Sequence, residues 1–362
     1  MTVGVEEEFL LVDPSTRRPV PRAADVLARV GALPPGAEVH RELSGTQVEF
    51  ASGVCDDLDE LRDQLTAGRR TLAGAAHAEG VRLLPSGSPP LADPEPRLSA
   101  GERFERIESV YRGQVSGYQC CGCHVHVGVP DRETAVHVVD HLRPWLPTLL
   151  ALGGNSPFDR GRDTGYASWR IMDQSGFPGS GVPPLFRTAA EHDARVARLV
   201  DCGVLVDAAM TFWLARPSPR YPTVEVRVAD TAATVDDAVL QAGLTRALVD
   251  TARSAGTAPE PDDQVLAAAV WSAARYGLSG PGVDPVVARQ VPALELVEAL
   301  LEHVSDALGD DRDHIRSLVR DVLVDGTGAQ RQRRAGSPEA AVDLLTCAST
   351  GVRLDGTGNP TS

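Results

Sequence analysis

Four short segments of this chain alternate apolar and reactive side chains with the period of a β-strand. They span residues 5–9, 46–50, 123–127 and 224–228. Successive side chains of a strand point to opposite faces, so each segment has one apolar face and one face that carries acids, imidazoles or a guanidinium group. This pattern predicts neighbouring strands of a half-buried antiparallel sheet.

The reactive faces of these segments carry more charge than a solvated sheet face usually does. Acids on one strand face repel each other unless a positive group lies between them. Carboxylates with an occasional imidazole suit Mg²⁺ or Mn²⁺, which keep coordination sites for phosphate oxygens. One glutamate alone is better interpreted as part of a solvated face, but several in phase favour a sheet that holds two or three divalent cations. The positions concerned are Glu6, Glu8, Glu49, His124, His126, Glu225 and Arg227.

Arg227 follows Glu225 by two residues, so both side chains lie on the same side of the predicted strand. An arginine beside metal-binding carboxylates is expected where a highly negative group, such as a triphosphate, lies between them. A salt bridge that neutralises Glu225 is the competing interpretation.

The charge and composition of the chain exclude several classes of function. The net charge of −15 and the pI near 5.0 argue against nucleic acid or an anionic membrane as the main partner. All 35 basic residues are arginine. Without lysine there is no phosphate-loop lysine, no Schiff base and no protein-kinase lysine. With no apolar run of about eighteen residues and no visible signal peptide, a cytoplasmic location is expected.

Three cysteines close to the histidines raise the question of a zinc site. Cys121 and Cys123 belong to the apolar face of their strand, away from His124 and His126, and no second Cys-x-x-Cys follows. Reduced, buried thiols are therefore the better interpretation. Cys120 shares the histidine face, and its role is left open.

The rest of the chain reads as helices that back the sheet. The strands lie in the first two-thirds of the chain, so the fold class is α+β, a curved antiparallel sheet backed by helices. The long segment 153–185, rich in Gly and Pro, is predicted to be a binding loop, in which Arg170 could also be a plain surface cation. Helices are predicted over residues 23–30, 57–80, 102–115, 131–152 with a bend near Pro144 and Pro147, and then from Thr234 almost to the end.

An ordered set of motifs resembles the bacterial type 2 glutamate–cysteine ligases, also called carboxylate–amine ligases, of the glutamine synthetase superfamily. The motifs are Gly4-Val5-Glu6-Glu7-Glu8-Phe9, Glu42 with Glu49, Gly122-Cys123-His124-Val125-His126-Val127-Gly128, Asn155-Ser156-Pro157-Phe158, Asp163 to Arg170, Thr223-Val224-Glu225-Val226-Arg227 with Asp230, and Trp271 to Gly277. Ser88 and Ser272 depart from the family pattern, which affects acceptor specificity rather than the metal site.

The resemblance implies a funnel-shaped antiparallel sheet, with ATP entering one end and the other substrates the opposite end. It implies one catalytic domain over residues 1–352, with a sheet-forming part at 1–232 and a mainly helical part at 233–352. Residues 353–362 are expected to be a disordered tail.

The resemblance also implies roles for individual residues. Arg227 matches the arginine that contacts the transferred phosphoryl group and thereby the nucleotide, and Arg170 matches a loop arginine that grips the carboxylate substrate. Tyr166, Ser168, Asn155 and, with less support, His126 are the other expected substrate-binding residues. The implied magnesium ligands are Glu6, Glu8, Glu42, Glu49, His124 and Glu225.

The implied reaction is an ATP-dependent ligation of the γ-carboxylate of glutamate to cysteine through an acyl phosphate. The implied partners are ATP, Mg²⁺ or Mn²⁺, glutamate or a similar carboxylate, and an amine such as cysteine. Neither nucleic acid nor a membrane is expected, and a homo-oligomer is allowed. No signature of cysteine recognition is present, so ligation to a different amine is an alternative.

Two alternatives come from other functional classes. His124-x-His126 on a strand is also found in metal-dependent hydrolases, although no lysine is present to bridge two metals and the other acids are not accompanied by further histidines. A non-catalytic protein that binds metal or nucleotide is the third hypothesis, and it is the least favoured because every expected site position is filled.

Overall fold

The computed structural model describes residues 1–92 and 98–349. The expected disordered tail at 353–362 lies outside the described residues. Within the described part of the chain, no helix is long and apolar enough to cross a membrane.

The centre of the fold is a seven-stranded sheet in which every strand pair is antiparallel. The four segments with alternating side chains form strands β1, β3, β5 and β11, as the sequence predicts. Strand order is β10-β11-β5-β1-β3-β2, and β4 also pairs with β1. The strands are β1 (Val3–Val12), β2 (Glu38–Arg41), β3 (Gln47–Ala51), β4 (Arg82–Leu84), β5 (Gly122–Gly128), β10 (Ala215–Pro217) and β11 (Thr223–Asp230).

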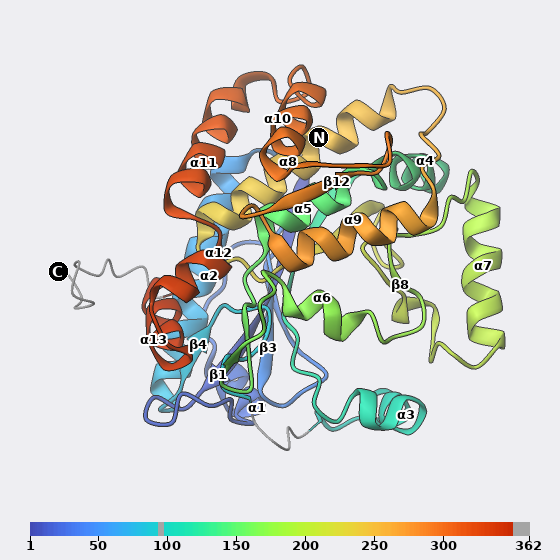
Figure 1. Ribbon diagram of the computed structural model, residues 1–362. Helices are drawn as coiled ribbons and strands as arrows, with labels where there is room; N and C mark the ends of the chain where they lie inside the picture. The colour runs from blue at the N-terminus through green and yellow to red at the C-terminus, as the bar shows by residue number, and fades with distance from the viewer. Residues whose placement is uncertain (93–97, 350–362) are drawn as a thin grey trace.

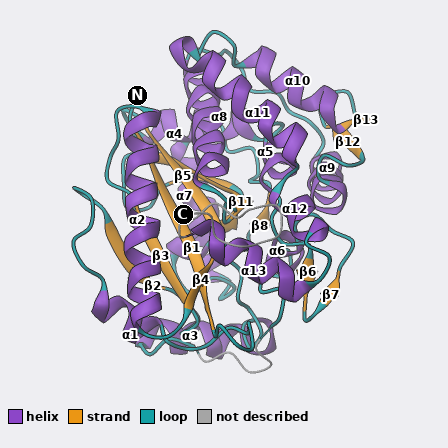
Figure 2. Cartoon of the chain, turned by 90° about the vertical axis from the view of Figure 1, so that its left-hand side faces the viewer, coloured by secondary structure: helices purple, strands orange, loops and turns teal. Residues whose placement is uncertain are grey.

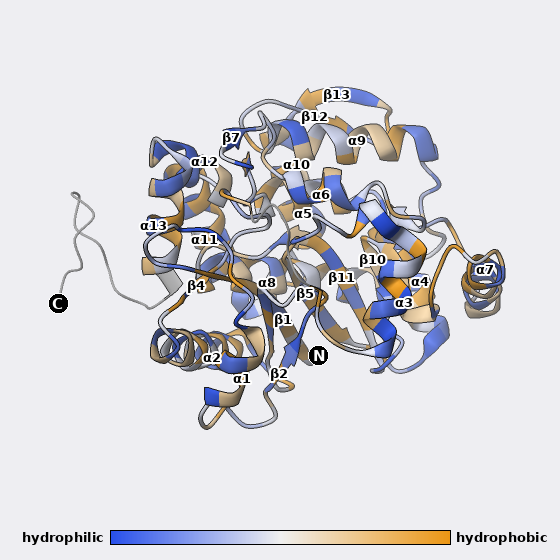
Figure 3. Cartoon of the chain, turned by 90° about the horizontal axis from the view of Figure 1, so that it is seen from below, coloured by the Kyte–Doolittle hydropathy of each residue, from blue (hydrophilic) through white to orange (hydrophobic). Residues whose placement is uncertain are grey.

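Helices cover the apolar face of the sheet and surround its edges. Val5, Val125 and Val226 on this face join one core cluster with leucines of α2 and α8. Figure 2 shows α2 running alongside the sheet, and the view from below places β1, β5 and β11 in the middle of a ring of helices (Figure 3). The first helices are α1 (Ala23–Arg29), α2 (Leu58–Ala78), α3 (Glu102–Tyr111), α4 (Arg132–Leu142), α5 (Leu146–Gly153), α6 (Trp169–Gln174) and α7 (Ala189–Asp201).

The C-terminal third is helical except for one hairpin, consistent with an α+β fold (Figure 1). Thr234 and Asp237 form the capping box that the sequence predicts at the start of α8. The hairpin of β12 (Pro281–Asp284) and β13 (Arg289–Pro292) interrupts a region for which helix was predicted throughout. The helices here are α8 (Val235–Arg253), α9 (Asp263–Tyr276), α10 (Ala293–His303), α11 (Arg312–Asp325), α12 (Gly328–Arg334) and α13 (Pro338–Ser349).

Two further expectations are corrected by the structure. The helix predicted over 131–152 is two helices, α4 and α5, because Pro144 stands between them and has no amide hydrogen for a helical bond. The predicted binding loop at 153–185 contains the helix α6 and three short strands, and Arg170 is buried in it rather than on the surface. The short strands are β6 (Phe158–Asp159), β7 (Arg162–Asp163) and β8 (Ser180–Gly181), which pairs with β9 (Phe212–Trp213).

A buried ion pair lies beneath the sheet, among the apolar side chains. Glu7 alternates with Glu6 and Glu8, so it points into the helix-covered face, where it is fully buried. Arg69 of α2 donates from Nε to Glu7 at 2.9 Å, and its Nη2 donates both to Glu7 and to the carbonyl of Ala232. The pair therefore ties β1 to α2 and to the segment before α8.

We expect Arg69→Met to lower the free energy of unfolding by about 3–5 kcal/mol, because it leaves Glu7 as an unpaired buried charge. The double substitution Arg69→Met with Glu7→Leu should recover much of this loss. Urea unfolding measures both values. Asp193→Asn, which removes the exposed partner of Arg132, is the matched control and should cost less than about 1 kcal/mol. An equal cost for both single variants would contradict this role of the pair.

Candidate active site

The strand register gathers the reactive residues on the face of the sheet opposite to the apolar core. Glu8 of β1 lies directly opposite Glu49 of β3. On the other side of β1, Glu6 lies opposite His124 of β5. Glu225 of β11 is in turn paired with His126. Side chains that are far apart in the sequence thus meet because four strands are neighbours in phase.

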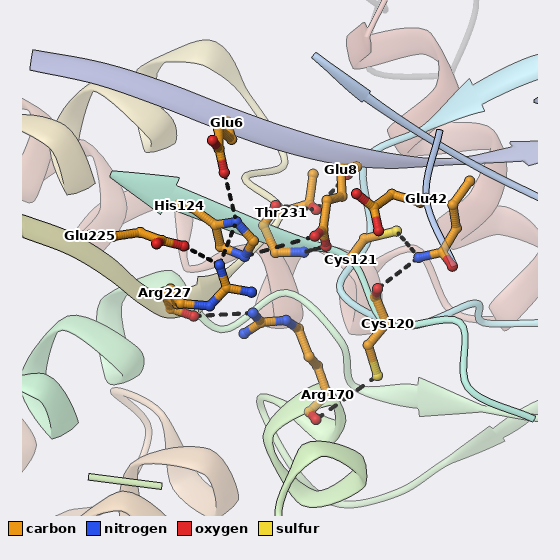
Figure 4. Close-up of polar contacts among 12 residues, drawn as sticks. Glu6, Glu8, Glu42, Cys120, Cys121, His124, Arg170, Glu225, Arg227 and Thr231 are labelled. Carbon is orange, nitrogen blue, oxygen red and sulfur yellow. Dashed lines mark hydrogen bonds and ion pairs between the residues drawn. The ribbon is translucent and has the colours of Figure 1, made fainter. Parts of the chain in front are cut away.

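Two groups of three residues could each hold a cation. One consists of Glu6, His124 and Glu225, and the other of Glu8, Glu49 and His124; within each group one ligand atom per residue lies within 4.8 Å of the others. His124 belongs to both groups and is 2% exposed. Figure 4 shows its ring between the glutamates of β1 and Arg227. These groups contain five of the six predicted metal ligands.

Glu42, the sixth predicted ligand, lies in the connection between β2 and β3. It is hydrogen-bonded to Glu49, and its charge raises the pKa of both Glu49 and Glu8. Figure 4 places it beside Glu8. Glu42 therefore borders the group of Glu8, Glu49 and His124 without being one of its three members.

The carboxylates around Glu8 are poorly stabilised as anions. Burial raises the pKa of Glu8 to about 8, and the neighbouring charge of Glu42 adds to the effect, which Arg170 and Arg227 only partly oppose. Burial and the charges of Glu42, Glu6 and Glu8 likewise raise the pKa of Glu49 well above its ordinary value. A divalent cation would relieve this repulsion, so the donor set fits a hard metal ion.

The group around Glu6 is stabilised in the ionised form. Burial would raise the pKa of Glu6, but hydrogen bonds and charges from His124 and His126 outweigh it and lower that pKa. For Glu225 the charges of Arg216 and Arg227 outweigh burial in the same way. Burial and the charge of Arg227 lower the pKa of His124 to about 4. His124 is therefore neutral at pH 7, which is the form that binds metals.

Arg227 and Arg170 lie next to each other at the centre of the site (Figure 4). Arg227 donates to Glu225, and its Nη1 lies 3.4 Å from Nδ1 of His124. Arg170 is 1% exposed and donates to the carbonyl of Arg227 at 3.0 Å. Its Nε finds no hydrogen-bond partner among the described residues. A buried guanidinium with an unused donor is suited to bind an anionic group.

Gly122 makes the position of Arg170 possible. A Cβ at this residue would lie 2.4 Å from Nη2 of Arg170 and 2.7 Å from Nε2 of His124. The amide of Gly122 also donates to Glu8 at 2.5 Å. The sequence motif contains this glycine, but only the structure gives the reason for it.

A buried hydrogen-bond network around Asp230 holds Arg170 and two of the expected substrate-binding residues. Asp230 accepts from the hydroxyl groups of Ser156 and Ser168 and from the amide of Asn155, each at 2.7 Å. The Asn155 side chain also donates to two carbonyls and accepts from Gln332. Ser168 and Asn155 are thus engaged in positioning α6, the helix that carries Arg170. The sequence motif contains Asp230, but sequence reasoning assigns no role to this residue.

Tyr166 and His126, also expected to bind substrate, lie in different places. Tyr166 packs edge-on against Trp169, with ring centroids 5.4 Å apart, and against Arg275, so it belongs to the outer wall of the site. His126 lies beside the first metal group, with Nε2 at 3.3 Å from Glu6 and Nδ1 at 2.9 Å from the hydroxyl of Thr223.

Arg216 of β10 is a further site residue that sequence reasoning missed. It is 8% exposed and contacts both carboxylate oxygens of Glu225, at 2.8 Å and 3.2 Å. It also donates to the carbonyls of Ala209 and Thr211. Arg216 therefore fixes the orientation of Glu225. Its position opposite Glu225 in the β10–β11 pair requires a hairpin that the sequence pattern alone does not reveal.

The cysteines near the histidines take no part in the metal groups. Cys123 packs into the apolar core, and Cys121 joins a smaller core cluster with Leu10 and Leu84. Burial raises the pKa of all three neighbouring thiols. Cys120 contacts the carboxylate of Asp173, with its Sγ 3.8 Å from Oδ2.

A cavity of about 530 Å³ opens at the end of β5 that carries His126. It adjoins Glu6, and its other walls are largely apolar. Val54, Tyr221 and Pro222 are among the lining residues. An aromatic ring and a charged group could therefore bind here side by side, with the charged group toward the metal groups.

Comparison with known proteins gives concordant matches over the whole chain. A family model for glutamate–cysteine ligase family 2 matches residues 2–343. A Saccharopolyspora erythraea protein with the provisional name glutamate–cysteine ligase 2-2 is 53% identical over 98% of this chain and 94% of its own length. A Nocardia farcinica protein, provisionally named glutamate–cysteine ligase 2-1, is 45% identical over 98% of this chain and 94% of its own length.

Solved structures confirm the expected kind of fold. Glutamate–cysteine ligase from Francisella tularensis, solved in complex with AMP, matches with a TM-score of 0.67 at 13% identity, over 99% of this chain and 90% of that one. A bifunctional glutathione synthetase from Pasteurella multocida gives 0.66 at 13% identity, over 97% of this chain and 52% of that one. At such low identities the likeness concerns the fold alone.

The raised pKa of Glu8 predicts how stability depends on pH without metal. Unfolded Glu8 ionises near 4.5, whereas the folded residue keeps its proton up to about 8. Between these values the native state binds more protons, so its free energy of unfolding falls as the pH rises. We expect the melting temperature to fall over this range, and Mg²⁺ or Mn²⁺ to raise it more at about pH 8 than at about pH 6. Metal-induced shifts of the same size at both pH values would contradict this expectation.

We expect Gly122→Ala to reduce turnover by about 100-fold, because the new methyl group displaces Arg170 or His124 and misplaced reacting groups are costly. Steady-state kinetics and thermal melting together separate this effect from unfolding. Gly74→Ala is the control: Gly74 lies in α2 with nothing within 4 Å of an added Cβ, and the change should stabilise the protein by about 0.5–1 kcal/mol. Unchanged turnover in Gly122→Ala would mean that Arg170 is not needed where it lies.

Proposed function

Because the chain belongs to glutamate–cysteine ligase family 2 and is an ATP-dependent ligase that forms an amide bond, we propose that it acts through a γ-glutamyl phosphate. In this proposal ATP phosphorylates the γ-carboxylate of glutamate, and an amine such as cysteine then displaces phosphate. The observation that carries the proposal is the pair of carboxylate-rich groups that share His124 and face two arginines. We place the reaction in one catalytic domain, over residues 1–352.

Two divalent cations, Mg²⁺ or Mn²⁺, fit the residues present. Glu6, His124 and Glu225 would hold one of them. Glu8, Glu49 and His124 would hold the other, with Glu42 beside it. When bound, such ions neutralise charge on the phosphates of ATP. The closeness of these carboxylates supports this assignment, because burial and mutual repulsion raise the pKa of Glu8 and of Glu49 and a bound cation would oppose both effects.

The cavity of about 530 Å³ beside Glu6 and His126, which we call the nucleotide cavity, is suited to the base and ribose of ATP. Its apolar walls include Tyr221 and Pro222, and Glu6 and His126 lie at its inner end. A base bound there would direct its phosphates along β5 toward His124 and Arg227. The nucleotide would thus enter from the end of the sheet where β5 finishes.

Arg227 and Arg170 have distinct roles in the proposal. Arg227, held beside Glu225 and His124, would stabilise the charge on the γ-phosphoryl group during transfer. Arg170 has an unused donor and lies against Gly122 and His124, so it would bind the carboxylate that attacks. Such positioning and charge stabilisation require no covalent enzyme intermediate.

The two chemical steps balance without a further reactant. A carboxylate oxygen of glutamate attacks the γ-phosphorus in line, and ADP leaves. The amine nitrogen then attacks the carbonyl carbon, the bond to phosphate breaks, and the amine loses a proton. Segment 153–187, which surrounds the site through α6, would keep water from the acyl phosphate. The use of ATP and glutamate also supports a cytoplasmic location.

A metal-dependent hydrolase is less well supported. Each three-residue group contains a single imidazole, that of His124. Among the described residues, His126 belongs to neither group. Carboxylate-rich sites favour Mg²⁺ over Zn²⁺. Ligation of glutamate to an amine other than cysteine remains the main alternative, since no described contact identifies the acceptor by itself.

The proposal predicts that the protein releases phosphate from ATP only when Mg²⁺ or Mn²⁺, glutamate and an amine are all present. Glu49→Gln should lower this rate by about 100-fold or more, because it removes charge from a cation ligand. Phosphate release and the product mass are the measurements. Glu298→Gln, on the exposed side of α10, is the matched control and should behave as the unaltered protein. Amide hydrolysis without ATP would instead favour the hydrolase.

A further inference from the structure

A second cavity, of about 610 Å³, lies at the opposite end of β5 from the nucleotide cavity. We call it the distal cavity. Its lining residues come from the segment just before β5, from the turn between β6 and β7, from α6, and from the loops that follow β1 and β4. They include Arg18, Tyr118, Asp159, Arg160, Trp169 and Asp173.

The helix α6 borders both the distal cavity and the metal groups. Trp169 and Asp173 are four residues apart and so share the face of α6 that lines the cavity. Arg170, three residues before Asp173, lies on the adjoining face and points toward Gly122 and His124. Cys120 contacts Asp173, and only two residues further on the amide of Gly122 binds Glu8. Two residues of extended chain span at most about 7 Å, so the cavity lies next to the second metal group.

The distal cavity carries charges of both signs. Burial and the charge of Asp159 raise the pKa of Asp173 to about 6, so an ammonium group near these two carboxylates would relieve their repulsion. Arg18 and Arg160 are exposed at the same cavity. A ligand with one ammonium and one carboxylate group would match this arrangement, whereas a simple anion would meet the two aspartates.

Arg160 adopts a backbone conformation that is unfavourable for arginine. It and Gly161 form the two-residue loop between β6 and β7, with φ values of 50° and 78°. Loops of this kind favour Asn-Gly or Asp-Gly, because both positions need positive φ. The Nε of Arg160 lies 3.8 Å from Oδ2 of Asp159, and its side chain is 67% exposed at the cavity, so it can also meet the carboxylate of a ligand.

The size of the cavity limits which amines would fill it. A volume of about 610 Å³ lies in the range that holds ligands of drug size. Cysteine, a small amino acid, would leave most of this space to water. The indole of Trp169 offers an apolar wall for a larger group.

We propose that the distal cavity binds the amine acceptor as a zwitterion larger than cysteine, either an amino acid with a large side chain or a short peptide. Its ammonium group lies at Asp159 and Asp173, and its carboxylate lies at Arg160 and Arg18. This inference rests on the proposed ligase function, because it assigns the acceptor of that reaction. It places the acceptor beside the face of α6 from which Arg170 would bind the donor carboxylate.

Equilibrium binding tests the cavity independently of turnover. Isothermal titration calorimetry of the full chain with Mg²⁺ and ADP would compare tyrosine, glycyl-tyrosine, cysteine and tyramine. We expect tyrosine or glycyl-tyrosine to bind more tightly than cysteine. Tyramine, which lacks the carboxylate, should bind about tenfold more weakly than tyrosine. Cysteine binding as tightly as either larger zwitterion, or no binding of these two, would overturn the proposal.

Two variants assign the charged groups. Arg160→Asn should weaken tyrosine binding about tenfold while leaving tyramine unchanged, and its melting temperature should equal or exceed that of the unaltered protein because Asn-Gly suits the turn. Asp173→Asn should weaken both ligands. Asp250→Asn, on the exposed side of α8, is the control. Unchanged tyrosine binding in Arg160→Asn and Asp173→Asn would overturn the assignment.

A trapping assay separates this inference from the ligase function itself. Hydroxylamine intercepts an acyl phosphate directly, so glutamyl hydroxamate formation by the unaltered protein reports the first chemical step without a bound acceptor. Zwitterion binding without any hydroxamate in the unaltered protein would contradict the ligase function and leave the cavity assignment standing. Hydroxamate formation without zwitterion binding would support the ligase function and overturn the cavity assignment.

Discussion

Electrostatic repulsion among the buried glutamates of the sheet is the constraint on which the rest of the site depends. Glu8, Glu42 and Glu49 have raised pKa values because they are buried next to one another. The backbone pairing of β1 with β3 holds Glu8 and Glu49 opposite each other. Such an arrangement is costly in the absence of a cation and favourable in its presence, which is why the metal assignment explains this face better than a solvated surface does.

Other acids of the same strands have partners that fix their positions. Glu7, between two of the reactive glutamates, points the opposite way and is neutralised by Arg69 in the core. Asp230, at the end of β11, receives hydrogen bonds that fix α6 and therefore Arg170. Arg216 holds both oxygens of Glu225 from the edge strand. These partnered acids thus anchor the scaffold around Glu8, Glu42 and Glu49.

The sequence predicted the parts of the site that depend on local periodicity. Alternation alone placed Glu6, Glu8, His124, Glu225 and Arg227 on one face, and the structure brings them together there. It could not predict Arg216 or the role of Asp230, because their partners are set by which strands and loops become neighbours. The hairpin at 281–292 was missed for a related reason, since strands this short have too few residues to show a period.

The short helix α6 links the reactive face of the sheet to the distal cavity. Its first residues present Arg170 to the metal groups, and Trp169 and Asp173 face the distal cavity one turn apart. A helix of six residues has little stability of its own, so its position depends on Ser168 as the N-cap and on Asp230 beneath it. Arg170 and Asp173 are therefore both positioned by one buried network, and displacing that network would move the two side chains together.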